Sequence, residues 1–99
     1  MRAQKKDTFH HDVVKAFEAL FWHTEDMTAR TEFCDIFVTS PDKSAWAWIE
    51  IKTGEKKKLT KGEVKFMEKC LLKDMPWYRC NGPEEVPVII KEILLRFAL

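Results

Sequence analysis

The stretch Trp46-Ala47-Trp48-Ile49-Glu50-Ile51-Lys52-Thr53-Gly54 decides the fold of this chain. Its aromatic and β-branched residues predict a strand over residues 45–53, which Gly54 ends. Side chains alternate faces along a strand, so Glu50 and Lys52 project to one face and the neighbouring isoleucines project to the other. Buried ionisable groups are costly unless they are paired or bind a metal. The strand therefore predicts a site that carries two charged side chains at one end of a sheet.

The sequence before this strand predicts its pairing partner. Residues 34–39 are rich in β-branched and aromatic side chains, and Ser40-Pro41-Asp42-Lys43-Ser44 has the composition of a turn. If the four residues after Ser40 form a hairpin loop, Asp35 lies opposite Glu50, with the two Cβ atoms roughly 5 Å apart. Two carboxylates at that distance repel each other, and a divalent cation is the usual compensation. The register therefore predicts a metal site at Asp35 and Glu50.

Asp42 is the competing aspartate, because it follows a proline and precedes Glu50 by a short interval. It lies at the tip of the predicted hairpin, however, and the length of the strand places it roughly 20 Å or more from Glu50. Asp42 is therefore predicted to form the turn, and Asp35 is predicted to supply the second carboxylate of the site.

Hydrophobic periodicity and capping signals predict helices around these strands. Thr60 and Glu63 form a capping box, which places the start of a helix near Lys61. The predicted elements are a helix over 8–22, two strands within 27–39 that meet near Glu32 and Phe33, the strand over 45–53, a helix from Lys61 to before Pro76, a strand over 77–80 and a helix over 84–97. A single bent strand over 27–39 is the alternative to the two strands. The predicted fold class is α/β, with the order α-β-β-β-α-β-α and a mixed sheet flanked by helices. The helix after Lys61 is predicted to bury Val64, Met67, Leu71 and Leu72, with Phe66 and Cys70 alongside.

The bulk composition predicts one domain over residues 1–99, in which 1–7 form a flexible N-terminus. No run reaches the roughly 18 apolar residues of a membrane span, and the N-terminal sequence does not suit a signal peptide. Three cysteines without CxxC spacing argue against a disulfide framework and against a zinc site. We expect a soluble protein in a cytoplasmic, reducing compartment, such as a bacterial or phage-infected cell.

The net charge of +1 hides a local excess of lysine. Glu55 and Glu63 are the only acidic residues within the fourteen positions that hold Lys52, Lys56, Lys57, Lys58, Lys61 and Lys65. A lysine run is often only a solvated surface. This run begins at the candidate site, however, and phosphate binding requires positive charge beside the chemistry. The sequence therefore predicts that Lys56, Lys57, Lys58 and Lys61 bind nucleic acid.

Together these residues resemble a known family. Asp35, a gap of fourteen residues and Glu50-Ile51-Lys52 on a hairpin resemble the PD-(D/E)XK nuclease superfamily. The run from Ile49 to Gly54, followed by Lys58-Leu59-Thr60, a helix and a strand that ends Arg79-Cys80, more closely resembles the VRR-NUC (virus-type replication-repair nuclease) domain, over about residues 9–97. Two positions depart from that family. Cys34 replaces the proline that usually precedes the first acidic residue, and Glu63 replaces a glutamine that many members carry.

The resemblance implies a restriction-endonuclease-like fold and metal-dependent hydrolysis of phosphodiester bonds in DNA. It implies that Asp35, Glu50 and the backbone carbonyl of Ile51 ligate Mg²⁺ or Mn²⁺, while Lys52 orients or helps to deprotonate the attacking water. Asp12 on the first helix is a further candidate ligand, although helix exposure also explains it. Glu63 is a candidate accessory residue, although its capping role is a sufficient explanation.

Small members of the family occur as free-standing phage or bacterial proteins. By analogy with them, we expect a homodimer that cuts branched or Holliday-junction DNA in repair or recombination, with residues 84–99 in the dimer surface. Neither a membrane nor a nucleotide cofactor is expected. Two other classes fit the same sequence: a catalytically silent nucleic-acid-binding module, and a protein-interaction subunit built on the same fold.

Overall fold

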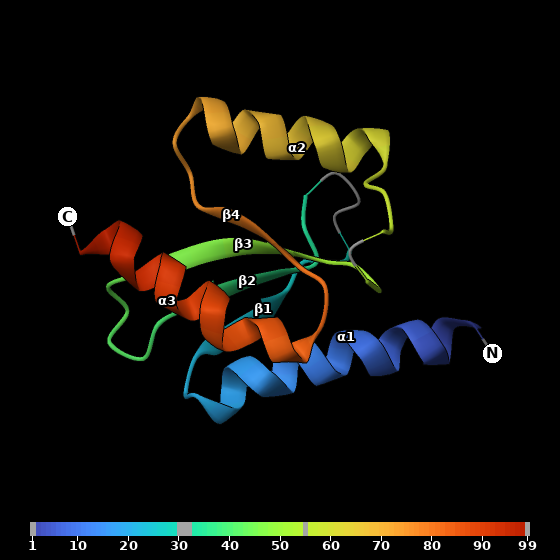
Figure 1. The fold of residues 1–99 in the computed structure, drawn as a ribbon, viewed down its shortest axis with the longest axis horizontal. Helices are drawn as coiled ribbons and strands as arrows, with labels where there is room; N and C mark the ends of the chain where they lie inside the picture. Colours follow the sequence, from blue (N-terminus) through green and yellow to red (C-terminus); the bar gives the residue numbers. More distant parts are fainter. Residues whose placement is uncertain (1, 30–32, 55, 99) are drawn as a thin grey trace.

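The computed structural model describes residues 2–29, 33–54 and 56–98. Its elements, in chain order, are α1 (Arg2–Ala19), β1 (His23–Asp26), β2 (Ile36–Thr39), β3 (Trp46–Ile51), α2 (Lys61–Leu72), β4 (Trp77–Cys80), a 3-10 turn η1 (Pro83–Glu85) and α3 (Val86–Phe97). The strands form one sheet in the order β1-β2-β3-β4, in which only the β3–β4 pair is parallel. Helix α2 covers one face of the sheet, and α1 and α3 cover the other (Figure 1). The predicted order of elements and the α/β fold class are confirmed.

The hairpin of β2 and β3 has the predicted register. Ile36 pairs with Ile49, and the backbone N–H of Ser40 donates to the carbonyl of Ala45 at 2.8 Å, so the four residues between them form the loop. Asp42 holds this loop, because its Oδ1 accepts hydrogen bonds from the backbone N–H of Ser44 and from the hydroxyls of Ser44 and Ser40. These bonds, those from Ser44 first, lower the pKa of Asp42 to about 2. The predicted turn role of Asp42 is confirmed.

The first strand lies earlier than the sequence predicted. Residues 27–32 were expected to form it, but β1 ends at Asp26. Asp26 Oδ1 accepts hydrogen bonds from the backbone N–H of Thr28 at 2.9 Å and from its hydroxyl at 2.6 Å, and this local turn competes with an extended backbone. Of the predicted junction between strands, Glu32 lies outside the described residues and Phe33 precedes β2.

Helix α1 also differs from the predicted range of 8–22, since it begins at Arg2 and ends at Ala19. It ends because Phe21 adopts a positive φ of 68°, which turns the chain so that the N–H of Trp22 donates to the carbonyl of Phe17 at 3.1 Å. The flexibility expected for residues 1–7 stays a prediction. No helix within the described ranges is long and apolar enough to span a membrane.

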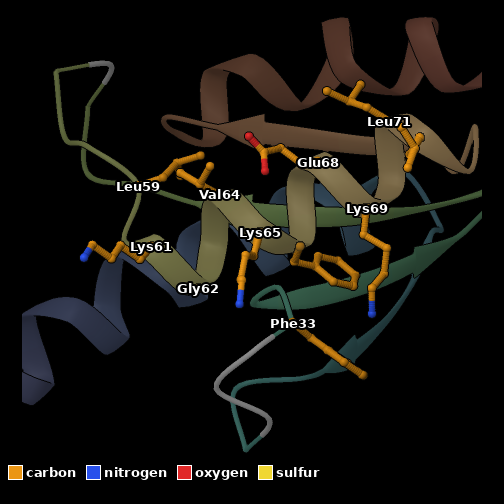
Figure 2. A pocket seen from close by; sticks show the side chains of 11 residues that line it. Phe33, Leu59, Lys61, Gly62, Val64, Lys65, Glu68, Lys69 and Leu71 are labelled. Atoms are coloured by element: carbon orange, nitrogen blue, oxygen red, sulfur yellow. The ribbon is translucent and has the colours of Figure 1, made fainter.

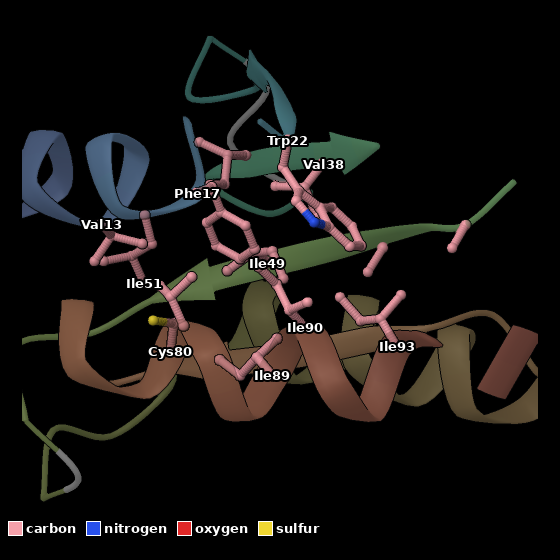
Figure 3. Close-up of a cluster of buried hydrophobic side chains, with 14 residues drawn as sticks. Val13, Phe17, Trp22, Val38, Ile49, Ile51, Cys80, Ile89, Ile90 and Ile93 are labelled. Carbon is pink, nitrogen blue, oxygen red and sulfur yellow. The ribbon is translucent and has the colours of Figure 1, made fainter. Parts of the chain in front are cut away.

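The main core lies between the sheet and the pair α1 and α3. Figure 3 shows Val13 and Phe17 of α1 and Ile93 of α3 converging on Ile49 of β3, and all four side chains are fully buried. The side chains of this cluster are apolar, so hydrophobic burial accounts for its stability. The three cysteines are free and buried, which confirms that they do not form disulfides.

A smaller cluster lies beneath α2, and it corrects the predicted buried face of that helix. Phe66 and Cys70 are buried, whereas Leu71 and Leu72 are 69% and 89% exposed, so the prediction that these leucines are buried was wrong. The sheet-facing positions begin with Glu63, which lies three residues before Phe66 and seven before Cys70. A carboxylate on the inward face interrupts the apolar periodicity, and the sequence pattern therefore pointed to the wrong side of the helix.

Candidate active site

The register of β2 and β3 brings Asp35 to the end of β3 that carries Glu50. The backbone N–H of Asp35 donates to the carbonyl of Ile49 at 3.1 Å, which continues the hairpin ladder by one residue beyond β2. Asp35 Oδ2 accepts a hydrogen bond from the backbone N–H of Ile51 at 2.8 Å. The Asp35 carboxylate is thus fixed against the backbone of β3, one residue from Glu50.

Glu50 is the buried charge of the site. It lies on β3 and is only 2% exposed, on the face of the sheet that α2 covers. Burial, then the charge of Asp35, then the hydrogen bond and charge of Glu63 raise the pKa of Glu50 well above its usual range. The carboxylates of Asp35, Glu50 and Glu63 therefore lie close together, and their negative charges repel one another. Such a cluster favours a proton or a cation beside it.

Lys52 supplies positive charge to the cluster. Its Nζ lies 2.8 Å from Oε1 of Glu63 and 3.7 Å from Oε2 of Glu50, and the lysine side chain is only 13% exposed. An ammonium that is largely buried requires such partners, because burial without them is costly. Lys52 and Glu50 therefore lie on the same face and in contact, as their spacing on the strand predicted.

Glu63 has two roles that the sequence could not separate. Its Oε1 accepts a hydrogen bond from the backbone N–H of Thr60 at 2.8 Å, and its own N–H donates to the Thr60 hydroxyl at 3.2 Å, which completes the predicted capping box. The same oxygen binds Lys52. Although burial opposes it, hydrogen bonding from Lys52 and Thr60 lowers the pKa of Glu63 below its usual value. The start of α2 is thus tied directly to the site.

Arg79 is a residue of the site whose role sequence reasoning missed. It pairs with Glu50 in the parallel register of β3 and β4. Its Nη2 donates to the carbonyl of Gly54 at 2.9 Å and to the carbonyl of Lys57, and its Nε donates to Oδ1 of Asn81 at 2.6 Å. The planar guanidinium thereby joins β4 to the loop that carries the lysines. The resemblance included an arginine at the end of this strand, but only the parallel pairing reveals its contacts.

The remaining predicted site residues lie at two places. Lys56, Lys57 and Lys58 are exposed on the loop after β3, and Lys61 is exposed in the first turn of α2, two residues before Glu63. Asp12 is exposed on α1, which covers the opposite face of the sheet from α2 (Figure 1). Within the described ranges, no group of three or more His, Cys, Asp or Glu side chains is placed to hold a metal ion. Asp12 therefore does not complete a three-ligand set there.

The donor set at the site nevertheless suits one class of cation. Asp35 and Glu50 offer carboxylate oxygens, and the backbone carbonyl of Ile51 follows directly in the chain. Mg²⁺ is commonly bound through one or two carboxylates while it keeps several waters, so two carboxylates are sufficient. Lys52 supplies one ammonium beside the carboxylates of Glu50 and Glu63, and burial together with the charge of Asp35 raises the pKa of Glu50. These residues fit a hard divalent cation of the Mg²⁺ or Mn²⁺ type.

The sheet order, the parallel β3–β4 pair joined through α2, and the helices on both faces make this a restriction-endonuclease-like fold. In particular, the chain has the fold of a solved structure described as a VRR_NUC domain, with a TM-score of 0.71 and 18% sequence identity. The match covers 88% of this chain and 95% of that one. No family model matches the sequence, and no curated protein matches it. The predicted fold is confirmed by this likeness.

Proposed function

We propose that this protein is a metal-dependent nuclease that hydrolyses phosphodiester bonds in DNA. The observation that carries the proposal is the buried Glu50, held beside Asp35 and Lys52 at one end of the sheet. The likeness of the fold to a VRR_NUC domain supports it, as does the sequence resemblance of the same residues to that family.

Each residue of the site has a role in this proposal. Asp35, Glu50 and the carbonyl of Ile51 would hold Mg²⁺ or Mn²⁺. Such a cation, when bound, polarises the phosphate and lowers the pKa of a coordinated water. Lys52 Nζ orients the attacking water and donates to the phosphate as negative charge develops on it. Glu63 positions Lys52, because its Oε1 holds the ammonium at 2.8 Å while the ammonium lies 3.7 Å from Oε2 of Glu50.

The surfaces around the site support a proposal for the substrate and for the assembly. Lys56, Lys57, Lys58 and Lys61 are exposed beside it and would contact phosphates without reading bases. We further propose a homodimer, with branched or four-way-junction DNA as the preferred substrate. Val88, Leu94 and Leu95 of α3 are exposed apolar residues that support a dimer surface on this helix.

A cleavage assay tests the proposal. Labelled duplex and four-way-junction DNA are incubated with the protein in Mg²⁺, Mn²⁺ or EDTA, beside the variants Glu50→Gln and Lys52→Gln. We expect cutting only with a divalent metal, and a loss of at least about a hundredfold in each variant. Calorimetric titration with Mn²⁺ gives a second readout, since Glu50→Gln is expected to weaken metal binding. Cutting that persists in Glu50→Gln would contradict the proposed mechanism.

A second candidate function has a specific observation in its favour. Lys52, the candidate catalytic ammonium, is ion-paired with Glu63 at 2.8 Å, as expected of a fold that binds nucleic acid without cutting it. In that case the protein binds DNA in EDTA and leaves every substrate intact with either metal. The same assay therefore separates the two functions.

A further inference from the structure

Positive charge in this chain is concentrated in one segment. Residues 56–73 hold seven lysines and two glutamates, whereas the remainder of the chain holds ten basic and fourteen acidic residues. The protein as a whole is nearly neutral, with a net charge of +1. One surface, formed by the loop after β3 and by α2, is therefore strongly positive, while the rest of the chain is negative overall.

Along α2 the lysines form a row. Lys61, Lys65 and Lys69 follow one another at intervals of four residues, and all three are exposed. In Figure 2, Lys65 and Lys69 project to the side of α2 on which Phe33 lies, whereas Val64, Glu68 and Leu71 project to the other side. Lys61, Lys65 and Lys69 line an open pocket along α2, together with Glu68 and with apolar residues such as Phe33 and Val64. We call Lys61, Lys65 and Lys69 the lysine row.

The lysine row is unfavourable for the helix itself. Like charges four residues apart repel each other, by about 0.2–0.5 kcal/mol per pair, and the row contains two such pairs. The helix dipole disfavours the cation of Lys61 in the first turn, although it favours that of Lys69 in the last turn. Glu63 does not neutralise the row, because its carboxylate is bound to Lys52 and Thr60. A polyanion bound along the row would relieve this repulsion.

The row also begins at the candidate active site. Lys61 is two residues from Glu63, which binds Lys52, so the charge continues from the site along the helix. From Lys61 to Lys69 the helix rises by about 12 Å, at roughly 1.5 Å per residue. That length matches three to four nucleotides of one duplex strand, at about 3.4 Å each.

We propose that Lys65 and Lys69 bind the phosphate backbone of DNA that extends from the active site along α2. The proposal rests on the nuclease function proposed above. In it, the lysine row binds the DNA next to the bond that is cut. The contacts are to phosphates, so they contribute affinity and register and do not read the base sequence.

Binding assays on the whole chain test this role. The double variant Lys65→Gln/Lys69→Gln is compared with Lys15→Gln/Lys91→Gln, which removes the same charge from exposed positions on α1 and α3. The affinity for a labelled duplex is measured by fluorescence anisotropy in EDTA between 50 and 200 mM salt. The logarithm of the binding constant is expected to fall with the logarithm of the salt concentration, with a slope of roughly 0.9 per phosphate contact. We expect the first variant to bind about tenfold more weakly, with a slope reduced by about 1.8, and the control to change much less.

Two further measurements make the result decisive. Lys65→Arg/Lys69→Arg retains the charge and is expected to restore affinity, and thermal melting checks that each variant is folded. If Lys65→Gln/Lys69→Gln binds as tightly as the control pair, or loses affinity with an unchanged salt slope, the proposal is wrong. If wild type itself neither binds nor cuts DNA, the proposed nuclease function fails instead, so the two failures are distinguishable.

Discussion

The two faces of the sheet differ in what they bury. Towards α1 and α3, β3 presents Ala47, Ile49 and Ile51, which pack in a cluster of apolar side chains. Towards α2, the same strand presents Trp48 and then Glu50, which is buried among other carboxylates. The residues of β3 that face α1 and α3 therefore stabilise the fold, whereas Glu50, which faces α2, belongs to a charged site. The larger apolar face can offset the cost of the charges on the smaller one.

The largest effect on stability is expected on the apolar face. Ile49→Ala removes a fully buried side chain from the main core and leaves a cavity between β3 and the helices. We expect the free energy of unfolding to fall by about 3 kcal/mol. This is a large share of the roughly 5–15 kcal/mol that stabilises a typical domain. Urea denaturation followed by circular dichroism measures the change.

The conservative variant Ile49→Val provides the control for this experiment. It removes one methylene group and is expected to cost about 1 kcal/mol. If Ile49→Ala lowered the free energy of unfolding by less than about 1 kcal/mol, the face of the sheet covered by α1 and α3 would not dominate stability. The proposed difference between the two faces would then be wrong.

A smaller effect is expected from Arg79, on the face that carries the site. Lysine cannot reproduce the donors that Arg79 directs to the carbonyls of Gly54 and Lys57 and to Asn81. Arg79→Lys is therefore expected to lower the free energy of unfolding by about 1.5 kcal/mol, since each hydrogen bond contributes about 0.5–1.5 kcal/mol. It is also expected to weaken DNA binding several-fold, because the loop that holds Lys56, Lys57 and Lys58 loses its anchor. Little change is expected in the cutting rate at saturating DNA.

Arg96→Lys is the matched control for that variant. Arg96 pairs with Asp74 at 2.8 Å, but the Asp74 side chain is 98% exposed, and exposed ion pairs contribute little. We expect a change below about 0.5 kcal/mol. Equal effects of Arg79→Lys and Arg96→Lys on stability and on binding would rule out an anchoring role for Arg79.

The hairpin and its register could be predicted because they depend on local chemistry. Turn residues 40–44 set the loop length, and the loop length places Asp35 beside Glu50. The position of β1 could not be predicted from β propensity, because the Asp26–Thr28 hydrogen bonds end the strand locally.

The contacts missed around the site depend on residues distant in sequence. Helix α2 turns Glu63 towards the sheet, where Glu63 binds Lys52. Leu71 and Leu72 are therefore exposed, although the sequence predicted that they would be buried. The role of Arg79 requires β4 to pair in parallel beside β3, which no local pattern reveals. Sequence therefore predicted the strand that carries Glu50 better than it predicted the elements that pack around it.

The change in stability expected at Glu50 is smaller than that at Arg79 and has the opposite sign. Glu50 is buried beside Asp35 and Glu63, so its carboxylate is more costly in the folded protein than in the unfolded chain. Glu50→Gln keeps the shape and removes that charge, and we expect the metal-free protein to become more stable by about 1 kcal/mol while it loses cutting activity. Urea denaturation in EDTA at neutral pH measures the gain. If the free energy of unfolding instead fell by 1 kcal/mol or more, Glu50 would stabilise the fold. The cluster would then be a structural ion-pair network rather than an active site that lowers the stability of the protein.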